Sequence, residues 1–257
     1  MVTLNALEND VLARLMADPA WAVYALADLE PALASHCLWV LPEARPASVA
    51  LLYCAFDTPI FWTSATPAEL APFAGDLFRH PALILQIQPG IVPLIENHYH
   101  HVQLHPMWRM SLSPRDFQPA APAPADRRLL PADLPALEAL YADGLAASEQ
   151  PDFFHPHMLS DGLFYGAFEA GELVAAAGTH VLSSRFSAAA IGNVYTRRDS
   201  RRRGHASRLT SLVAAGLYRS GAATIALSVR RENPAFAVYR ALGFRPHCEF
   251  FEGHASR

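Results

Sequence analysis

Hydrophobic residues recur along this chain with two periods, one typical of helices and one typical of strands. Leu7, Val11 and Leu15 stand at helical spacing and predict an amphipathic helix over 5–16. The same patterns predict the other elements of the first half: helices over 20–33 and 67–78, and strands over 35–41, 47–56, 60–62, 82–86 and 102–110.

The second half alternates strands and helices more regularly. Helices are predicted over 131–145, 204–220 and 234–242, strands over 163–168, 172–181, 186–196, 222–230 and 245–251, and an irregular segment or short helix over 151–159. Residues 169–172 form a hairpin turn, because Gly171 can take a positive φ. This order predicts an α/β (α+β) fold, with helices flanking a mixed central sheet.

Composition sets the class of protein. The 257 residues are 52% hydrophobic and 17% charged, which excludes a disordered chain. No apolar run is long enough to cross a bilayer and no signal peptide is visible, so we expect no membrane partner and a cytoplasmic location. The three cysteines, Cys37, Cys54 and Cys248, are far apart and typical of reduced thiols.

A Pro/Ala-rich stretch and a shift of charge divide the chain. Residues 119–126 read as an extended linker between an N-terminal α/β domain, 1–118, and a second domain, 127–257. Residues 1–126 have a charge balance of −7 and residues 127–257 one of +3. All basic residues are arginine, a bias typical of GC-rich bacterial genomes to which we give no functional weight. The asymmetry indicates that the second domain faces an anion.

The chemistry is concentrated where a predicted strand ends and a helix begins, in the sequence Gly192-Asn-Val-Tyr-Thr-Arg-Arg-Asp-Ser-Arg-Arg-Arg-Gly-His-Ala206. Free N–H groups at a helix start attract phosphate, Gly204 lets a ligand approach the backbone, and the arginines add charge. The pattern favours a diphosphate-containing ligand, with a solvated basic turn or a nucleic-acid patch as alternatives. The cluster is local and has no interleaved aromatic platform, so we expect no nucleic-acid partner.

Two motifs in this half resemble those of the GNAT superfamily of acetyl-CoA-dependent acyltransferases. Residues 201–206 match its phosphate loop, [Q/R]-x-x-G-x-[G/A]. Residues 233–244 resemble N-x-x-A-x-x-x-Y-x-x-L-G-F, with one residue fewer between Asn233 and Tyr239 and with Ala237 one place from the usual small residue. Val194-Tyr195-Thr196 resembles the family's fourth strand, especially in the glycine-N-acyltransferase-like branch. The resemblance covers about 127–253 and implies a GNAT-like fold with acetyl-CoA as cosubstrate.

The resemblance also implies roles for individual residues. Val194 and Tyr195 would pair with the pantetheine arm, and Tyr239 would be the general acid that protonates the departing thiolate. The pyrophosphate would be held by the backbone of the loop, and Asn233 and Phe236 would meet the pantetheine channel. The loop residues are Arg201, Arg202, Arg203, Gly204, His205, Ala206 and Ser207. An ordinary core aromatic is the alternative for Tyr239, and the His205 imidazole would face either the phosphates or solvent.

The base that deprotonates the amine is not identified. Many relatives use a glutamate on the fourth strand, but residues 186–196 contain no acid. The candidates are Glu149, Asp152, His155, His180 or a water chain. In the segment His155-Pro-His157 a substrate-binding role is also open.

The first half carries no comparable motif. His98, His100, His101 and His105 crowd one segment, but three or four converging ligands are needed for a metal, and we expect none. The order of its predicted elements resembles that of the second half, so it is interpreted as a degenerate copy that shapes the acceptor pocket or a dimer interface.

The sequence thus predicts an N-acyltransferase that moves an acetyl group from acetyl-CoA to an amine of a small molecule or peptide, as a monomer or homodimer. The alternative is a CoA-binding module without turnover, suggested by the missing carboxylate. The acceptor, the acyl chain preference and the role of the first domain are not determined by the sequence.

Overall fold

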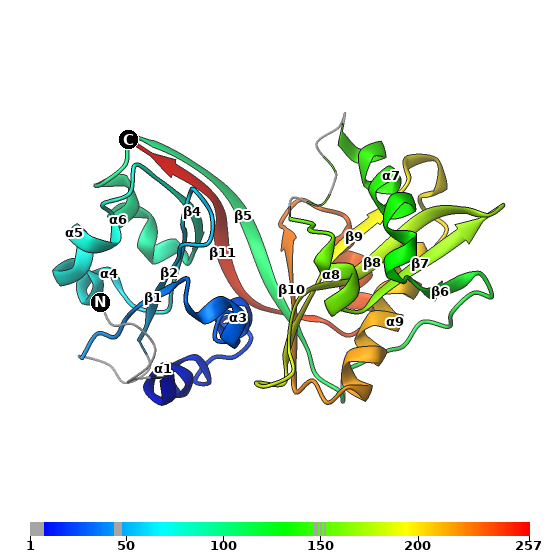
Figure 1. Ribbon diagram of the computed structural model, residues 1–257, viewed down its shortest axis with the longest axis horizontal. Coiled ribbons are helices and arrows are strands. Elements are labelled where there is room, and N and C mark those ends of the chain that lie inside the picture. Colours follow the sequence, from blue (N-terminus) through cyan, green and yellow to red (C-terminus); the bar gives the residue numbers. More distant parts are fainter. Residues whose placement is uncertain (1–7, 44–47, 146–148, 150, 152) are drawn as a thin grey trace. The chain divides into compact units, whose positions relative to one another are not determined.

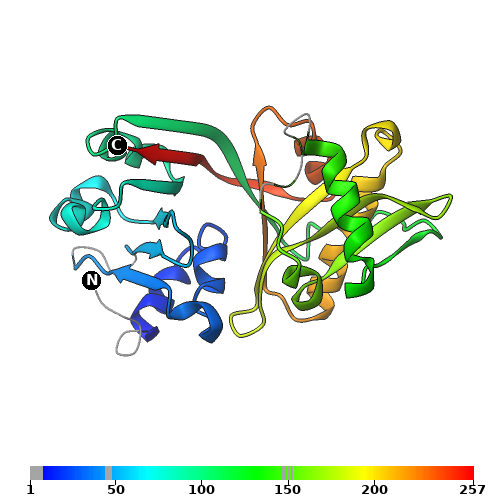
Figure 2. The ribbon, with the colours of Figure 1, turned by 45° about the horizontal axis from the view of Figure 1, so that its top comes forward.

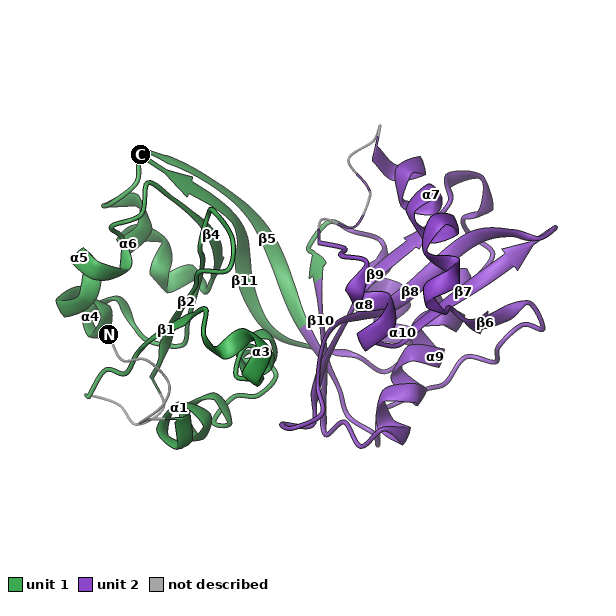
Figure 3. Cartoon of the chain, in the orientation of Figure 1, with its two compact units in different colours: residues 1–109, 229–232, 246–257 green, residues 110–228, 233–245 purple. Residues whose placement is uncertain are grey.

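The computed structural model describes residues 8–43, 48–145, 149, 151 and 153–257, which form two compact units (Figures 1 and 3). Unit 1 comprises residues 1–109, 229–232 and 246–257, and unit 2 comprises residues 110–228 and 233–245. Neither unit is a continuous segment, because the C-terminal residues belong to unit 1. Residues 119–126 lie in unit 2, and the domain boundary predicted there stays a prediction.

Unit 1 is built on a sheet with the strand order β1-β2-β3-β4-β11-β5. Its strands are β1 (Cys37–Val40), β2 (Ala50–Tyr53), β3 (Ile60–Thr63), β4 (Ala82–Ile87), β5 (His101–Leu112) and β11 (Arg245–Ser256). The last three residues of β5 and the first residue of β11 belong to unit 2. The helices of unit 1 are α1 (Glu8–Leu15), α2 (Val23–Ala27), α3 (Pro31–Ala34), α4 (Pro67–Leu70), α5 (Ala74–Leu77) and α6 (Val92–Glu96). Leu52, Phe61 and Leu85 pack with helix residues such as Leu70 and Ile95 in one apolar cluster, and this burial stabilises the unit.

The strands of unit 2 pair in the order β10-β9-β8-β7-β6, and the last two residues of β10 belong to unit 1. These strands are β6 (Asp126–Arg128), β7 (Phe164–Glu169), β8 (Glu172–Ser183), β9 (Ala188–Thr196) and β10 (Thr224–Arg230). The helices of unit 2 are α7 (Leu134–Leu145), α8 (His157–Asp161), α9 (His205–Arg219) and α10 (Ala235–Ala241). The predicted hairpin between β7 and β8 is confirmed, with positive φ at Ala170 (48°) and Gly171 (86°).

Helices α7 and α9 cover opposite faces of the unit 2 sheet (Figures 1 and 2). Phe164 packs in the cluster that contains Leu140 and Tyr141 of α7, whereas the hydroxyl of the next residue, Tyr165, lies beside Gly216 of α9. Consecutive residues of a strand point to opposite faces, so the sheet separates the two helices.

The strand pairings of the two units follow the same order. In unit 1, β1, β2 and β3 pair antiparallel, and β3 then pairs parallel with β4 after a helical connection. In unit 2, β6, β7, β8 and β9 pair antiparallel, and β9 then pairs parallel with β10 after α9.

Proline accounts for two differences from the predicted elements. The single helix predicted over 20–33 is divided into α2 and α3, since Glu30 before Pro31 is extended (ψ 140°). The helix predicted over 67–78 is likewise interrupted, at Pro72, into α4, a 3-10 turn and α5. The starts predicted at residues 5 and 47 lie outside the described residues. Within the described part of the chain, each helix is too short or too polar to cross a membrane.

Candidate functional site

The loop between β9 and α9 leaves the N-terminus of a long helix open. Arg202 (φ 63°) and Gly204 (φ 79°) adopt left-handed conformations, and Gly204 is the N-cap of the 15-residue helix α9. No side chain of the described residues caps this end, so the first-turn N–H groups point outward together with the positive end of the helix dipole. This is the geometry that binds phosphate.

Acidic side chains surround the loop and pair with most of its arginines. Arg201 meets Glu149 (2.5 Å) and Arg203 meets Glu169 (2.8 Å). Arg202 is exposed, and no partner for it is found among the described residues. Pairs this exposed contribute little to stability, so an incoming phosphate can displace them at small cost.

His205 holds the first turn of α9 from the inside. Its side chain is 6% exposed, its Nε2 lies 3.2 Å from Glu169 Oε1, and Arg208 Nη2 lies 3.0 Å from its Nδ1. Arginine can only donate, so Nδ1 is the acceptor and the Nε2–H donates to Glu169. Arg208 in turn pairs with Asp126 at 2.8 Å. Both ring nitrogens are thus used within the protein, unlike either predicted orientation of this imidazole. The backbone N–H groups of His205, Ala206 and Ser207 remain the groups predicted to contact a ligand.

Strand β9 separates from β10 next to this loop. Parallel pairing runs from Ala188 to Ile191, opposite Thr224 to Leu227, and is not found for Gly192–Thr196, all of which are described. Asn193 has a positive φ (53°), and the register with β8 shifts at this point, as in a β-bulge. The bulge is fixed because Tyr141 donates to the Asn193 carbonyl (2.8 Å). An extended arm can therefore pair with this edge of β9.

Val194 and Tyr195, the two strand residues predicted to meet pantetheine, lie on the unpaired stretch. The Tyr195 side chain is buried, and its hydroxyl donates to Asp143 of α7 (2.7 Å). Val194 is half-buried. The side chain of Tyr195 thus positions the strand, and the main-chain contact with pantetheine stays a prediction.

Tyr239 lies on α10, with its ring against Phe244 (6.0 Å between centroids). Burial raises the pKa of Tyr239 to about 12, so the phenol is protonated at neutral pH. No hydrogen bond to its hydroxyl is found among the described residues. Gly243 in the same motif has a φ of 97°, and a Cβ there would lie 1.9 Å from the Asp116 carbonyl oxygen, which explains the glycine.

The other two motif residues lie at the start of α10. Asn233 Oδ1 accepts the N–H of Ala235 (2.8 Å), so this side chain orders the helix start. Phe236 is half-buried. Their predicted contact with pantetheine stays a prediction.

The described candidates for the base lie in different surroundings. Glu149 is engaged by Arg201, whose hydrogen bond lowers the pKa of Glu149. Asp152 lies outside the described residues. His155 stacks on His157, which is exposed, with ring centroids 5.7 Å apart. His180 lies directly over Gly192, where a Cβ would be 2.9 Å from the Cβ of His180.

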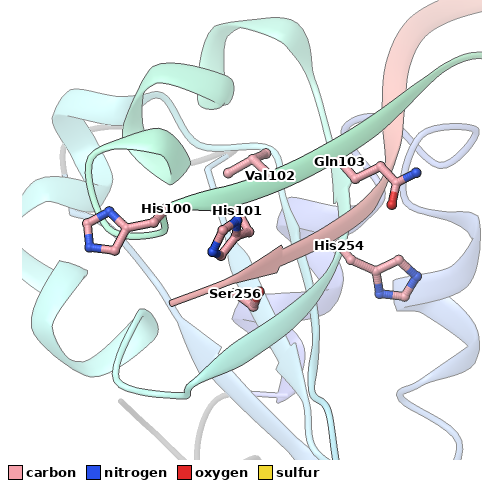
Figure 4. Close-up of a pocket in the computed structure, with 6 residues that line it drawn as sticks. All are labelled: His100, His101, Val102, Gln103, His254 and Ser256. Atoms are coloured by element: carbon pink, nitrogen blue, oxygen red, sulfur yellow. The ribbon is translucent and has the colours of Figure 1, made fainter.

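The histidines of the first half do not converge. His98 Nδ1 lies 2.9 Å from the Leu94 carbonyl oxygen, and its ring packs against Phe78. His100, His101 and His254 line a pocket in unit 1, but Figure 4 shows them spread along it. Within the described ranges there is no group of three or more His, Cys, Asp or Glu suited to a metal ion.

Comparison with known proteins confirms the predicted fold class. Residues 164–250 match the family model described as FR47-like protein, and none of the curated proteins compared matches the chain. A GNAT-family protein from Novosphingobium aromaticivorans is 22% identical with a TM-score of 0.61, covering 90% of this chain and 96% of that one. A GCN5-related N-acetyltransferase from Kribbella flavida is 18% identical with a TM-score of 0.62, covering 90% and 95%. A tandem GNAT protein from the clavulanic acid biosynthesis pathway is 14% identical with a TM-score of 0.60, covering 99% and 97%. The chain therefore has a two-domain GNAT-like fold.

Proposed function

We propose that this protein is an N-acyltransferase that moves an acetyl group from acetyl-CoA to an amine of a small molecule or peptide. The observation that carries the proposal is the open N-terminus of α9 beside the unpaired edge of β9. A pyrophosphate fits the first feature and an extended pantetheine arm fits the second. The match of residues 164–250 to the FR47-like family supports the same assignment.

The donor is bound mainly through the main chain. The backbone N–H groups of residues 201–207 hold the pyrophosphate, and the main chain of Val194 and Tyr195 pairs with the pantetheine. Asn233 and Phe236 line its path toward the thioester. This arrangement aligns the thioester carbonyl at the bulge of β9, where a backbone N–H can stabilise the developing oxyanion.

The reaction is direct attack of the amine on the thioester. Tyr239 protonates the departing thiolate, for which a protonated phenol free of other hydrogen bonds is suited. The protein acts in a bacterial cytoplasm as a monomer or homodimer. Unit 1 is a degenerate copy of the same fold, a proposal supported by the common order of antiparallel and parallel pairings.

Calorimetry of acetyl-CoA on the whole protein tests the donor site, with dephospho-CoA and adenosine as controls. We expect acetyl-CoA and dephospho-CoA to bind and adenosine not to bind, because adenosine lacks the pyrophosphate and the pantetheine. A thiol-release assay with a panel of amines then tests transfer. Absence of binding up to millimolar acetyl-CoA refutes the proposal. Binding without thiol release for any amine favours the alternative, a CoA-binding module without turnover.

A further inference from the structure

The side chain of His180 lies where β9 separates from β10. Thr179 and Val181 of β8 are in register with Ile191 and Ala190 of β9, so the residue between them, His180, is the extra residue of a β-bulge. A bulge redirects a side chain, and bulges are frequent beside active sites. His180 is thereby turned toward the first residue of β9 that has lost its β10 partner, Gly192.

The absence of a side chain at Gly192 is what admits the imidazole. A Cβ at this position would lie 2.9 Å from His180 Cβ and 3.4 Å from both Cγ and Nδ1. Any other residue would displace the ring from the strand. The imidazole therefore lies directly over the backbone where the stretch of β9 that is not paired with β10 begins. The bulge expected to hold the thioester lies beside it.

An aromatic residue covers the imidazole. The Phe153 ring lies 5.8 Å from the His180 ring at an interplanar angle of 34°, and it also lies 5.4 Å from the His155 ring. His180 is half-buried as a result. The contact with Phe153 limits the orientation of the His180 ring, and the ring stays partly exposed to solvent.

Three carboxylates around the loop that follows β9 are engaged with other side chains. Glu149 pairs with Arg201, Glu169 pairs with Arg203 and His205, and Asp143 accepts from Tyr195. Strand β9 itself contributes no acid. An imidazole has an ordinary pKa near neutrality, which suits it to take a proton from an alkylammonium ion.

We infer that His180 is the proton acceptor for the amine substrate, an inference that rests on the proposed acyl transfer. His180 takes one proton from the ammonium group, and the nitrogen lone pair forms a bond to the thioester carbonyl carbon. The C–S bond then breaks, its electron pair leaves with sulfur, and Tyr239 protonates the thiolate. The second amine proton returns through solvent to the Tyr239 phenolate, and His180 releases its proton to solvent.

The experiment compares two nucleophiles in the thiol-release assay. One is the alkylamine that wild type uses best, which is protonated at neutral pH, and the other is methoxyamine, which is not. The variants are His180→Ala and His180→Gln, with His36→Ala as the matched control because that imidazole is exposed and belongs to unit 1. Calorimetry with acetyl-CoA verifies that each variant folds and retains the donor site.

We expect His180→Ala and His180→Gln to lower kcat/KM for the alkylamine about 100-fold, within the usual range for a general base. The methoxyamine rate changes by less than about threefold, because this nucleophile needs no base before it attacks. Added imidazole restores alkylamine turnover in His180→Ala, where the ring has left a space, and not in His180→Gln. His36→Ala behaves like wild type.

Two results overturn the inference and leave the proposed function standing. One is an equal loss with both nucleophiles and no rescue by imidazole, which assigns His180 a structural role. The other is unchanged alkylamine turnover in both variants, which places the base elsewhere. If wild type binds acetyl-CoA but transfers to neither nucleophile, the proposed acyl transfer fails and the inference fails with it.

Discussion

The hydroxyl of Tyr239 combines a raised pKa with the absence of a protein hydrogen-bond partner among the described residues. We predict that Tyr239→Phe lowers kcat about 100-fold, the usual contribution of a general acid, while the Kd for acetyl-CoA changes by less than about threefold. The ring is retained in phenylalanine, so its packing against Phe244 is preserved. Steady-state thiol release and calorimetry measure the two quantities.

The pH profile gives a second check on the same residue. Because the pKa of Tyr239 is raised to about 12, the phenol remains protonated throughout ordinary assay conditions. Activity should therefore show no alkaline decline from this group below about pH 10. Full activity in Tyr239→Phe would remove the residue from the mechanism.

Gly204 differs from other glycines with positive φ because a ligand is expected against it. Among the described residues, only Arg208 Nη1 would lie within 4 Å of a Cβ added there, at 3.5 Å, so these residues leave the space open. We predict that Gly204→Val weakens acetyl-CoA binding at least tenfold, since the side chain blocks the approach of phosphate to the backbone. Isothermal calorimetry measures the change.

Gly221 provides the matched control. It follows the other end of α9 and has a similar φ of 87°, and no atom of the described part of the chain lies within 4 Å of an added Cβ. Gly221→Val therefore imposes a similar backbone strain without reaching the loop. Equal weakening by both substitutions would show that strain in α9, and not contact with phosphate, is responsible.

At the residue scale, the sequence predicts residues that are needed for the local conformation of the backbone. Gly204 and Gly243 are found from the sequence because each stands in a motif, and the structure gives both a positive φ. The bulge at His180 and the pairing of His205 with Glu169 are not predictable. Both depend on which residues of separate strands and helices meet, and a single sequence does not encode that register explicitly.

At the scale of elements, the two units differ at the N-terminus of one helix, α4 in unit 1 and α9 in unit 2. Each of these helices follows a strand, β3 or β9, that pairs parallel with the next strand along the chain. In unit 2 this end is open behind Gly204. In unit 1 the start of α4 is closed by a capping box, because Glu69 accepts from the Thr66 N–H (2.8 Å) and from its hydroxyl (2.8 Å). A carboxylate thus occupies the place that an anion would take, and α4 has only four residues.

Glu69 should accordingly stabilise unit 1 and have no part in donor binding. We predict that Glu69→Ala lowers the free energy of unfolding of unit 1 by about 1–2 kcal/mol, from the lost cap and the lost bond to Ser48. All four tryptophans (Trp21, Trp39, Trp62 and Trp108) belong to unit 1, so their fluorescence in urea reports on this unit. Acetyl-CoA affinity should not change, and a tenfold loss would contradict the assignment of the donor site to unit 2 alone.

Elements of unit 2 are predicted better than those of unit 1 for a physical reason. The helix over 204–220 and the hairpin at 169–172 are specified by local periodicity and turn chemistry. In unit 1, prolines interrupt apolar stretches that otherwise have helical spacing, and the short helix α6 shows little periodicity. Strand β6, directly after the Pro/Ala stretch, is not predicted. It forms by pairing with β7, a long-range contact that local sequence patterns do not reveal.

At the scale of the whole molecule, the chain's last strand completes the sheet of the first unit. Residues 251–256 of β11 pair antiparallel with residues 82–87 of β4, and β11 lies between β4 and β5 in the strand order. The approach to β5 is close, since a Cβ at Gly253 would lie 1.9 Å from the Gln103 carbonyl oxygen. Unit 1 therefore needs residues from both ends of the sequence.

This arrangement makes a prediction about a chain cut at the proposed linker. A specific protease site inserted between residues 120 and 124, a largely exposed stretch, separates the two fragments covalently. We expect them to co-elute in gel filtration without denaturant, because removing β11 would leave β4 and β5 with unpaired edges inside the unit 1 sheet. Separation should require urea, and Gly253→Val should promote it by blocking the contact with Gln103. Fragments that separate in native buffer, each with its fold retained, would instead establish 1–118 and 127–257 as independent domains.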